Sequence, residues 1–283
     1  MVRGVGVGMR ERILTNSSAA PDEAPIAFVD SGVGGLPYLD WVRERLPGET
    51  FVYWADRANF PYGPKTPEEV AEAVSSGVAA LVREVGPKLV VVACNTASVV
   101  ALARLRREFP DLPFVGTVPA VKPAALASRS KKIGVWATER TIRDSYLDDL
   151  VRKHAAGCEV VRVAGPGIVD LVENRLFEST PEERGRVVAG AAEIFRGRGV
   201  DQVVLGCTHF IYVAEDLRRR LGAGVGIMDS REGVGGRVLA LSGTVGLSRR
   251  KGRDRMYLSG SRDPEPRYRD FAARFRLEMA GVL

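Results

Sequence analysis

Residues 89–98 read LVVVACNTAS: four apolar residues, a short Ala-Cys step, and then small polar residues that can open a helix. Short runs rich in β-branched residues are typical of buried strands, and they recur along this chain between longer amphipathic stretches. The predicted strands are residues 26–29, 51–54, 89–92, 133–136, 160–163 and 203–205. Strands that alternate with helices form βαβ units, so the sequence predicts an α/β fold with mostly parallel sheets.

The amphipathic stretches between these strands are long enough to be crossover helices. We predict helices over residues 67–84, 141–154 and 181–196. Near the C-terminus, apolar residues at helical spacing predict one last amphipathic helix that packs back on the protein: Tyr268, Phe271, Ala272, Phe275 and Met279.

The chain contains the same kind of turn twice. One predicted strand leads into Cys94-Asn95-Thr96, and a later strand leads into Cys207-Thr208-His209, about one lobe's length further along. We therefore predict two similar doubly wound lobes with the active site in the cleft between them. The first lobe is expected to comprise residues 25–119 and 227–283, the second residues 120–226, and residues 1–24 are expected to form a flexible leader.

Composition limits the classes of protein that this chain can represent. With 283 residues, 45% of them hydrophobic and 27% charged, it can bury a substantial core. Its three cysteines, at 94, 158 and 207, are odd in number and widely spaced, which argues against a disulfide framework and leaves thiols free for chemistry. No apolar run is long enough to span a bilayer and the leader lacks a secretory signal, so we expect a cytoplasmic protein without a membrane partner.

The positive charge of the chain is modest. A net charge of +6 suits an anionic substrate without requiring one. The densest basic cluster consists of Arg249, Arg250, Lys251, Arg253 and Arg255. Few aromatic residues are interleaved with it, so a solvated loop is favoured over a nucleic-acid interface.

Three polar turns follow predicted strands, at the position where open α/β sheets bind ligands. They are DSGVGG at residues 30–35, CNTAS at residues 94–98 and CTH at residues 207–209. Each offers small polar side chains and free backbone N–H groups that could hold a carboxylate. The glycine-rich turn matches neither the dinucleotide-binding spacing nor a P-loop, so nucleotide binding is disfavoured.

The cysteines in two of these turns are the candidate chemical groups. A single cysteine at the end of a buried strand is more often a small core residue than a catalyst. Two such cysteines, each followed by hydrogen-bonding residues and a helix, favour chemistry, and this setting is expected to lower the pKa of each thiol. Cys158 lacks the setting and is interpreted as structural.

The two histidines have different contexts. His154 ends a predicted surface helix, where a capping or solvated role is expected. His209 stands two residues after Cys207, so it either tunes that thiol and relays its proton or makes a structural hydrogen bond. Neither a metal nor a cofactor is expected, because no other cysteine–histidine pair completes zinc-ligand spacing and no cofactor signature is present.

Taken together, these turns resemble the cofactor-independent aspartate/glutamate racemase family in their order and spacing. The likeness covers nearly the whole chain after the leader, since residues 55–65, ADRANFPYGPK, and residues 133–138, IGVWAT, are similar to further family segments. The pairing of CNTAS with GCTH is of the glutamate type. Two features depart from the family pattern: residues 165–168, GPGI, which precede Glu173, and Ile211, where the family commonly has proline.

The resemblance implies roles for individual residues. Cys94 and Cys207 would be the acid/base pair, with Asp30 assisting Cys94 and with His209 and Glu173 assisting Cys207. The implied substrate-binding residues are Asp30, Ser31, Tyr62, Gly63, Asn95, Thr96, Thr208 and His209. The implied activity is the cofactor-free interconversion of L- and D-glutamate by a homodimer, which would supply D-glutamate for peptidoglycan in a bacterium.

Two thiols suit such a reaction on chemical grounds. Inversion of a stereocentre by proton transfer requires a base on one face of Cα and an acid on the other, and two facing thiols supply both. The developing carbanion needs stabilisation that pyridoxal would ordinarily provide. In its place we expect hydrogen-bond donors aimed at the α-carboxylate, from Ser31, Asn95, Thr96 and Thr208.

Three alternative functions stay open at this point. The nearest is a racemase of the same superfamily that acts on aspartate or a related acid. A cysteine-nucleophile hydrolase would use one thiol with His209 and would leave the second matched turn unexplained. A basic nucleic-acid-binding module would account for residues 249–255 and for none of the turns.

Overall fold

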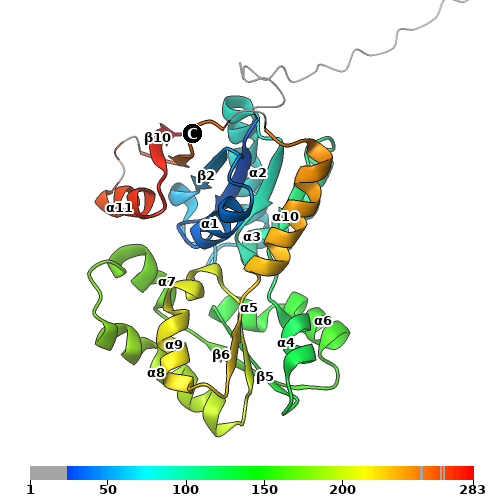
Figure 1. The fold of residues 1–283 in the computed structure, drawn as a ribbon, viewed down its shortest axis with the longest axis vertical. Coiled ribbons are helices and arrows are strands. Elements are labelled where there is room, and N and C mark those ends of the chain that lie inside the picture. Colours follow the sequence, from blue (N-terminus) through cyan, green and yellow to red (C-terminus); the bar gives the residue numbers. More distant parts are fainter. Residues whose placement is uncertain (1–23, 249–250, 262, 264) are drawn as a thin grey trace, which may run out of the picture.

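The computed structural model describes residues 24–248, 251–261, 263 and 265–283, which form two lobes, each built on its own parallel sheet (Figure 1). Apart from Ala24, the expected leader lies outside the described residues, as do Arg249 and Arg250 of the basic cluster. Every strand pairing in both sheets is parallel. The predicted α/β class with mostly parallel sheets in two lobes is confirmed.

The first sheet has six strands. In spatial order they are β10 (Glu278–Val282), β9 (Arg255–Leu258), β2 (Phe51–Ala55), β1 (Ile26–Asp30), β3 (Leu89–Val92) and β4 (Phe114–Gly116). The three central strands are buried throughout, which is why they consist of apolar residues on both faces rather than an alternating pattern.

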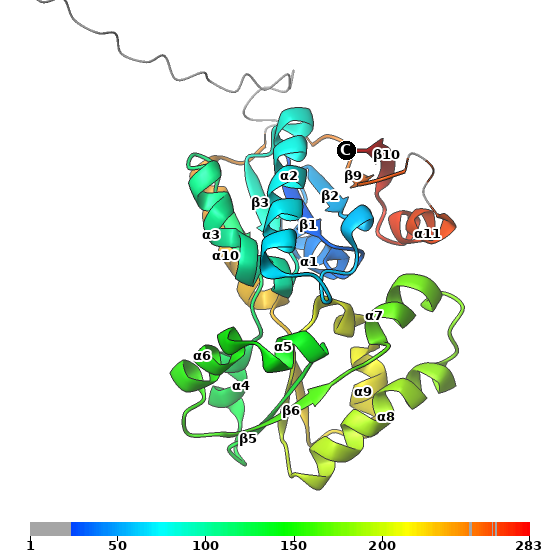
Figure 2. The same ribbon diagram turned by 180° about the vertical axis from the view of Figure 1, so that it is seen from behind.

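Helices cover both faces of the first sheet. On one face α1 (Leu36–Arg45) packs against α10 (Arg231–Val245), and on the other α2 (Pro67–Val85) packs against α3 (Asn95–Glu108), as the two views show (Figures 1 and 2). Local sequence sets the ends of α2: Thr66 and Glu69 form a capping box at its start, and Gly86, with φ 59°, ends it in the left-handed region.

The second sheet has four strands in the order β6 (Glu159–Ala164), β5 (Lys132–Ala137), β7 (Gln202–Leu205) and β8 (Gly226–Met228). The helices of this lobe are α4 (Val121–Ala127), α5 (Glu139–Arg143), α6 (Ser145–His154), α8 (Pro181–Gly197) and α9 (Ala214–Leu221). Helix α4 packs against α6, and α8 packs against α9 (Figure 1). Short helical turns, α7 (Ile168–Asp170), η3 (Leu171–Arg175) and η4 (Thr208–Val213), follow the ends of β6 and β7.

Two of the predicted helices are wrong in detail. The helix expected over residues 141–154 is divided into α5 and α6, because Asp144 leaves the helical conformation and its carboxylate accepts a 2.9 Å bond from Tyr146 N to start α6. The last helix, α11 (Pro266–Arg274), stops before Arg276, whose φ of 55° is left-handed, so Met279 lies in strand β10 instead.

The chain crosses between the lobes twice, from β4 to α4 and from β8 to α10. The second crossing comes slightly later than the expected boundary, because Ile227 and Met228 pair with β7 as part of the second sheet. One continuous hydrophobic cluster joins the lobes: it contains Phe28 of β1 and Phe271 of α11 together with Phe195 of α8 and Phe210 of η4.

Candidate active site between the lobes

The three polar turns meet in one cavity between the lobes, of about 430 Å³. Both candidate cysteines line this cavity: Cys94 follows β3 of the first sheet, and Cys207 follows β7 of the second. The other predicted site residues on its wall are Ser31, Tyr62, Gly63, Asn95, Thr96, Thr208 and His209. Asp30 and Glu173 do not line the cavity and lie behind this wall, 2% and 1% exposed.

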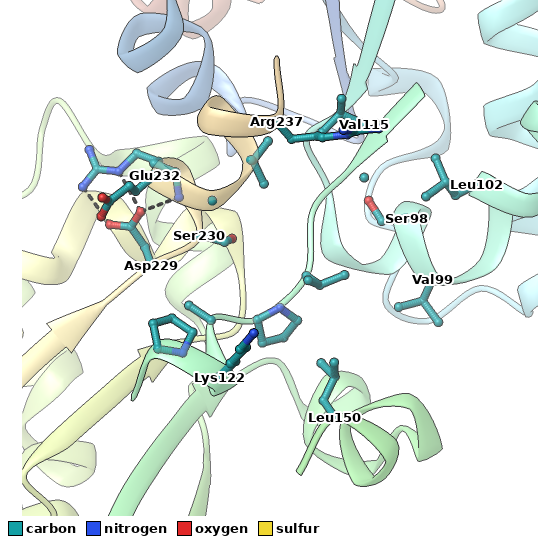
Figure 3. A pocket seen from close by; sticks show the side chains of 18 of the residues that line it. Ser98, Val99, Leu102, Val115, Lys122, Leu150, Asp229, Ser230, Glu232 and Arg237 are labelled. Carbon is teal, nitrogen blue, oxygen red and sulfur yellow. Dashed lines mark hydrogen bonds and ion pairs between the residues drawn. The ribbon is translucent and has the colours of Figure 1, made fainter. Parts of the chain in front are cut away.

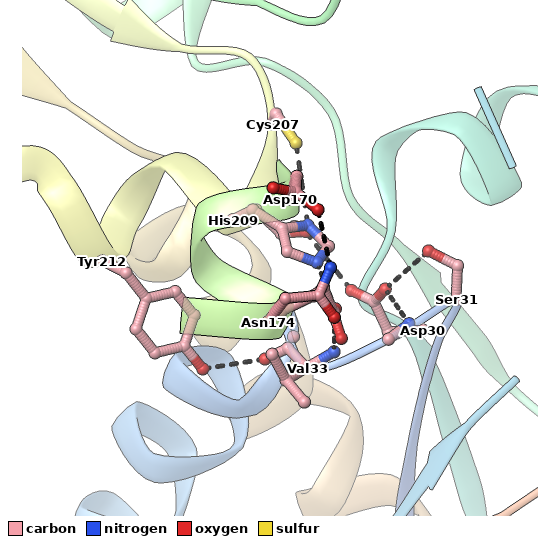
Figure 4. A network of polar contacts seen from close by, with 12 residues as sticks. Asp30, Ser31, Val33, Asp170, Asn174, Cys207, His209 and Tyr212 are labelled. Carbon is pink, nitrogen blue, oxygen red and sulfur yellow. Dashed lines mark hydrogen bonds and ion pairs between the residues drawn. The ribbon is translucent and has the colours of Figure 1, made fainter. Parts of the chain in front are cut away.

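Asp30 ends strand β1 on the first-lobe side of the cavity. Its carboxylate accepts bonds from Ser31 Oγ at 3.2 Å and Gly32 N at 3.0 Å, and from Thr208 Oγ1 of the second lobe at 3.3 Å (Figure 4). Burial raises the pKa of Asp30 to about 6, although the nearby His209 opposes the rise. Asp30 can therefore exchange a proton near neutral pH.

Cys94 occupies the N-cap position of α3 and is nearly buried. Burial raises the pKa of its thiol well above the ordinary value, and the negative charge of Asp30 raises it further. The backbone N–H groups of Ala97 and Ser31 act in the opposite direction and are outweighed. The expectation that the strand-to-helix turn lowers the pKa is wrong for Cys94, because loss of hydration exceeds the effect of the helix start.

Cys207 faces a buried relay on the second-lobe side. Its Sγ lies 3.8 Å from His209 Nδ1 (Figure 4). His209 Nε2 in turn lies 2.6 Å from Glu173 Oε1. Burial alone would lower the pKa of His209, but the contacts with Cys207 and Glu173 outweigh it and raise the pKa well above the ordinary value. The arrangement can supply a proton to Cys207 or receive one from it.

Glu173 also joins the two lobes. Its Oε1 accepts a 2.7 Å bond from the backbone N–H of Val33, in the DSGVGG turn of the first lobe. This turn approaches so closely that a Cβ on Gly32 would overlap the Glu173 carboxylate, and one on Gly34 would overlap Thr208 and His209. Glycine at these two positions lets the lobes meet around the cavity.

Tyr62 and Gly63 belong to a loop that hydrogen bonds to Asp56 hold in place. Tyr62 Oη donates to Asp56 Oδ2 at 2.7 Å, and Ser259 Oγ donates to Asp56 Oδ1 at 2.6 Å. Arg140 of the second lobe donates to the carbonyls of Gly63 and Lys65, which ties the outer end of the loop to α5. The loop therefore forms a wall of the cavity that both lobes support.

Asn95 supplies unused hydrogen-bonding capacity at the cavity. Its side chain is 6% exposed, and neither Oδ1 nor Nδ2 has a hydrogen-bond partner among the described residues. Buried polar atoms without partners are costly, so their presence on a cavity wall indicates that a polar ligand completes them.

Several cavity-lining residues are absent from the sequence-based set: Phe60, Pro61, Thr138, Thr141, Gly167, Val169 and Asp170. Thr138 follows β5, and residues 167–170 follow β6, so both groups lie at carboxyl ends of parallel strands. The rule that located the three polar turns could have located these two as well.

The remaining cysteine and histidine lie away from this cavity. Cys158 packs, partly buried, beside the core of α4 and α6. His154 stands in the last turn of α6, as predicted, and lines a separate cavity of about 1260 Å³. Lys122, Leu150 and Asp229 line the same cavity (Figure 3). This larger cavity is bounded by both interlobe crossings, including Val118 and Asp229, and neither Cys94 nor Cys207 reaches it.

Within the described ranges, no set of three or more His, Cys, Asp or Glu side chains is arranged to hold a metal ion. No helix in the same ranges has the length and apolarity needed to cross a membrane.

Known proteins with similar sequences and structures are racemases. The family model described as Asp/Glu/Hydantoin racemase matches residues 38–232. Glutamate racemase of Sphingopyxis alaskensis is 47% identical over 79% of this chain and 83% of its own, and that of Roseiflexus sp. is 43% identical over 80% and 82%. The crystal structure of Escherichia coli glutamate racemase in complex with L-glutamate and activator UDP-MurNAc-Ala is 31% identical, with a TM-score of 0.79 over 92% of this chain and 97% of that one. The chain therefore belongs to the Asp/Glu/hydantoin racemase family, on its glutamate racemase branch.

Proposed function

We propose that this protein racemises glutamate with two thiols: either Cys94 or Cys207 removes the Cα proton, and the other cysteine delivers its own proton to the opposite face. The observation that carries the proposal is that these cysteines, from different sheets, line one cavity of about 430 Å³. That volume suits a single small amino acid, so both thiols can contact the same carbon.

The residues around each thiol support opposite roles at a given moment. One sulfur must be a thiolate that removes the Cα proton, while the other is a thiol that returns a proton to the opposite face. Asp30 lies near Cys94 and can take up or release its proton, and His209 does so for Cys207 with support from Glu173. The assignments exchange when the other enantiomer binds.

Residues of the three polar turns would stabilise the carbanion that forms when Cα loses its proton. The side chains of Ser31, Asn95, Thr96 and Thr208 line the cavity and can bond the α-carboxylate as it gains enolate character. Of these side chains, Asn95 is best suited to bind the carboxylate, because its amide group has no hydrogen-bond partner among the described residues. The buried wall strengthens each of these contacts by excluding water.

Glutamate is the substrate that the relatives favour. The relatives from Sphingopyxis alaskensis and Roseiflexus sp. are named glutamate racemases, and the Escherichia coli glutamate racemase structure holds L-glutamate. From this likeness we further propose that the protein works in the cytoplasm as a homodimer and supplies D-glutamate for peptidoglycan. Aspartate is the second candidate substrate, and chiral chromatography of both amino acids after incubation with the enzyme decides between them.

Serine replacement of each cysteine tests the assignment. Cys94→Ser and Cys207→Ser are expected to lower racemisation by at least about 10³-fold, because an alcohol is a far poorer base than a thiolate. Cys158→Ser is the matched control and keeps wild-type activity. A cysteine hydrolase would instead lose activity with only one of the first two changes and would form a trappable acyl-enzyme.

A further inference from the structure

The backbone of Val33 is held by the second lobe at both of its polar groups. Its N–H donates to Glu173 Oε1 at 2.7 Å, and its carbonyl accepts from Tyr212 Oη at 2.8 Å (Figure 4). Val33 is fully buried and belongs to the turn that begins at Asp30. Together the two bonds hold this turn of the first lobe in one position and orientation relative to the second lobe.

Tyr212 lies on η4, the helical turn that Cys207 opens as its N-cap residue. Its ring packs edge-on against Phe271 at 5.8 Å and Phe275 at 6.3 Å between ring centroids. Both phenylalanines lie at or just after α11, between β9 and β10 of the first sheet. One side chain thus links the segment of Cys207 to two parts of the first lobe.

The hydroxyl of Tyr212 is suited to a permanent structural bond. Burial raises its pKa well above the ordinary value for tyrosine, and the nearby Glu173 and Asp30 charges add to the rise. A raised pKa keeps the phenol protonated near neutral pH, so Tyr212 acts as the donor to the Val33 carbonyl.

We propose that Tyr212 is a positioning residue that sets the register of the two lobes, and with it the placement of the Cys207 sulfur opposite the Cys94 sulfur. The proposal rests on the two-thiol function above. A small rotation of one lobe moves one sulfur relative to substrate Cα, and proton transfer falls steeply with such displacement. The bond from Tyr212 Oη to the Val33 carbonyl opposes this rotation where the turn that begins at Asp30 meets the segment that begins at Cys207.

Tyr212→Phe is the direct test, because it keeps the ring on Phe271 and Phe275 and removes only the hydroxyl. We expect kcat to fall about three- to tenfold in both directions, the effect of one lost neutral bond and an unpaired buried carbonyl. KM should change by less than about twofold and the pH profile should not move, because no proton-transfer group is altered. Tyr268→Phe is the matched control: Tyr268 lies on α11, and its buried hydroxyl has no partner among the described residues.

A second readout does not depend on activity. In a Cys158→Ser background, 1,3-dibromoacetone joins two close thiols through two thioether bonds with loss of two bromides, and intact mass separates this bridge from single alkylation. Tyr212→Phe is expected to lower the ratio of bridge to single alkylation about fivefold relative to Tyr268→Phe.

The outcomes separate this proposal from the proposed function. Wild-type kcat in Tyr212→Phe, a shifted pH profile, or lost activity with an unchanged bridging ratio each overturns the positioning role. If the unmodified enzyme racemises no amino acid, the proposed function fails, and the bridging ratio still decides whether Tyr212 sets the register.

Discussion

Asp30 shows at the residue scale how the site is tuned by burial. Its pKa rises to about 6 because the carboxylate loses hydration, so it is ionised at pH 8 and protonated at pH 5. If it exchanges a proton with Cys94, kcat/KM should fall as the pH drops below about 6. Asp30→Asn should lower kcat/KM about 10²-fold at pH 8 and remove this acidic limb. Rate profiles from pH 5 to 9 measure both effects, with the exposed Asp111→Asn as control.

The same shift has a consequence for stability. A carboxyl with a raised folded-state pKa stabilises the fold below its unfolded pKa, near 3.8, and this contribution is lost as the pH rises through about 6. Ionised Asp30 therefore costs the folded state about 2–3 kcal/mol at pH 8. An acid-base group kept at such a cost agrees with a functional role, and a wild-type acidic limb in Asp30→Asn would contradict that role.

At the residue scale the sequence identified nine residues that line one cavity in the structure, and it did not reveal the electrostatics of that cavity. The cysteine turns and Ser31 could be predicted because they follow strands of parallel sheets, whereas Tyr62 and Gly63 came from the family resemblance. The pKa of Cys94 is raised rather than lowered, because the thiol is buried in a cluster of first-lobe residues that lie far apart in the sequence. Glu173 reaches His209 from a short helical turn after β6, and spacing alone could not reveal that contact.

At the element scale the loop that carries Tyr62 depends on a strand near the C-terminus. Ser259, directly after β9, donates to Asp56 and accepts from Ala58 N at 2.9 Å, and Asp56 in turn holds Tyr62. Ser259→Ala should raise KM for glutamate about three- to tenfold with a smaller change in kcat, because the thiols are untouched. Steady-state kinetics measure the split, and the exposed Ser261→Ala is the control. An unchanged KM would show that the anchor does not matter for binding.

The elements themselves were predictable where local sequence decides them. The six strands rich in β-branched residues and the capped helices α2 and α8 appear within two residues of their expected bounds. Strands β4, β8, β9 and β10 are not among the six predicted strands, because such short strands carry weak patterns and depend on pairing with distant neighbours. The division at Asp144 was missed because one capping aspartate interrupts an otherwise continuous amphipathic pattern.

At the scale of the whole molecule, close approach of the lobes is the central structural requirement. Gly32→Ala would place a Cβ against the Glu173 carboxylate, which would have to move away from Val33 N and His209. We expect kcat/KM to fall about 10²-fold, because the bond that joins the lobes and the support of His209 are both disturbed. Gly190→Ala is the control, since its Cβ would meet nothing within 4 Å on the exposed face of α8. Wild-type kinetics in Gly32→Ala would show that the approach seen here is not required for turnover.

The repeated strand–cysteine–helix turn predicted two lobes, and the structure has two separate parallel sheets, one in each lobe. The seam between them could not be predicted in the same way. It is made by residues far apart in the chain, such as Tyr212 with Val33 and Arg140 with Gly63. Such contacts arise only when the complete fold brings the segments together.

Solvent deuterium tests the opposed thiols most directly. L-glutamate is incubated with the enzyme in D₂O, and Cα deuterium is measured in both enantiomers at low conversion by mass spectrometry after chiral separation. Two thiols on opposite faces predict that D-glutamate carries deuterium from the first turnovers while the remaining L-glutamate keeps its proton. D-glutamate that retains the original proton, or L-glutamate that gains deuterium as fast as product forms, would contradict the account.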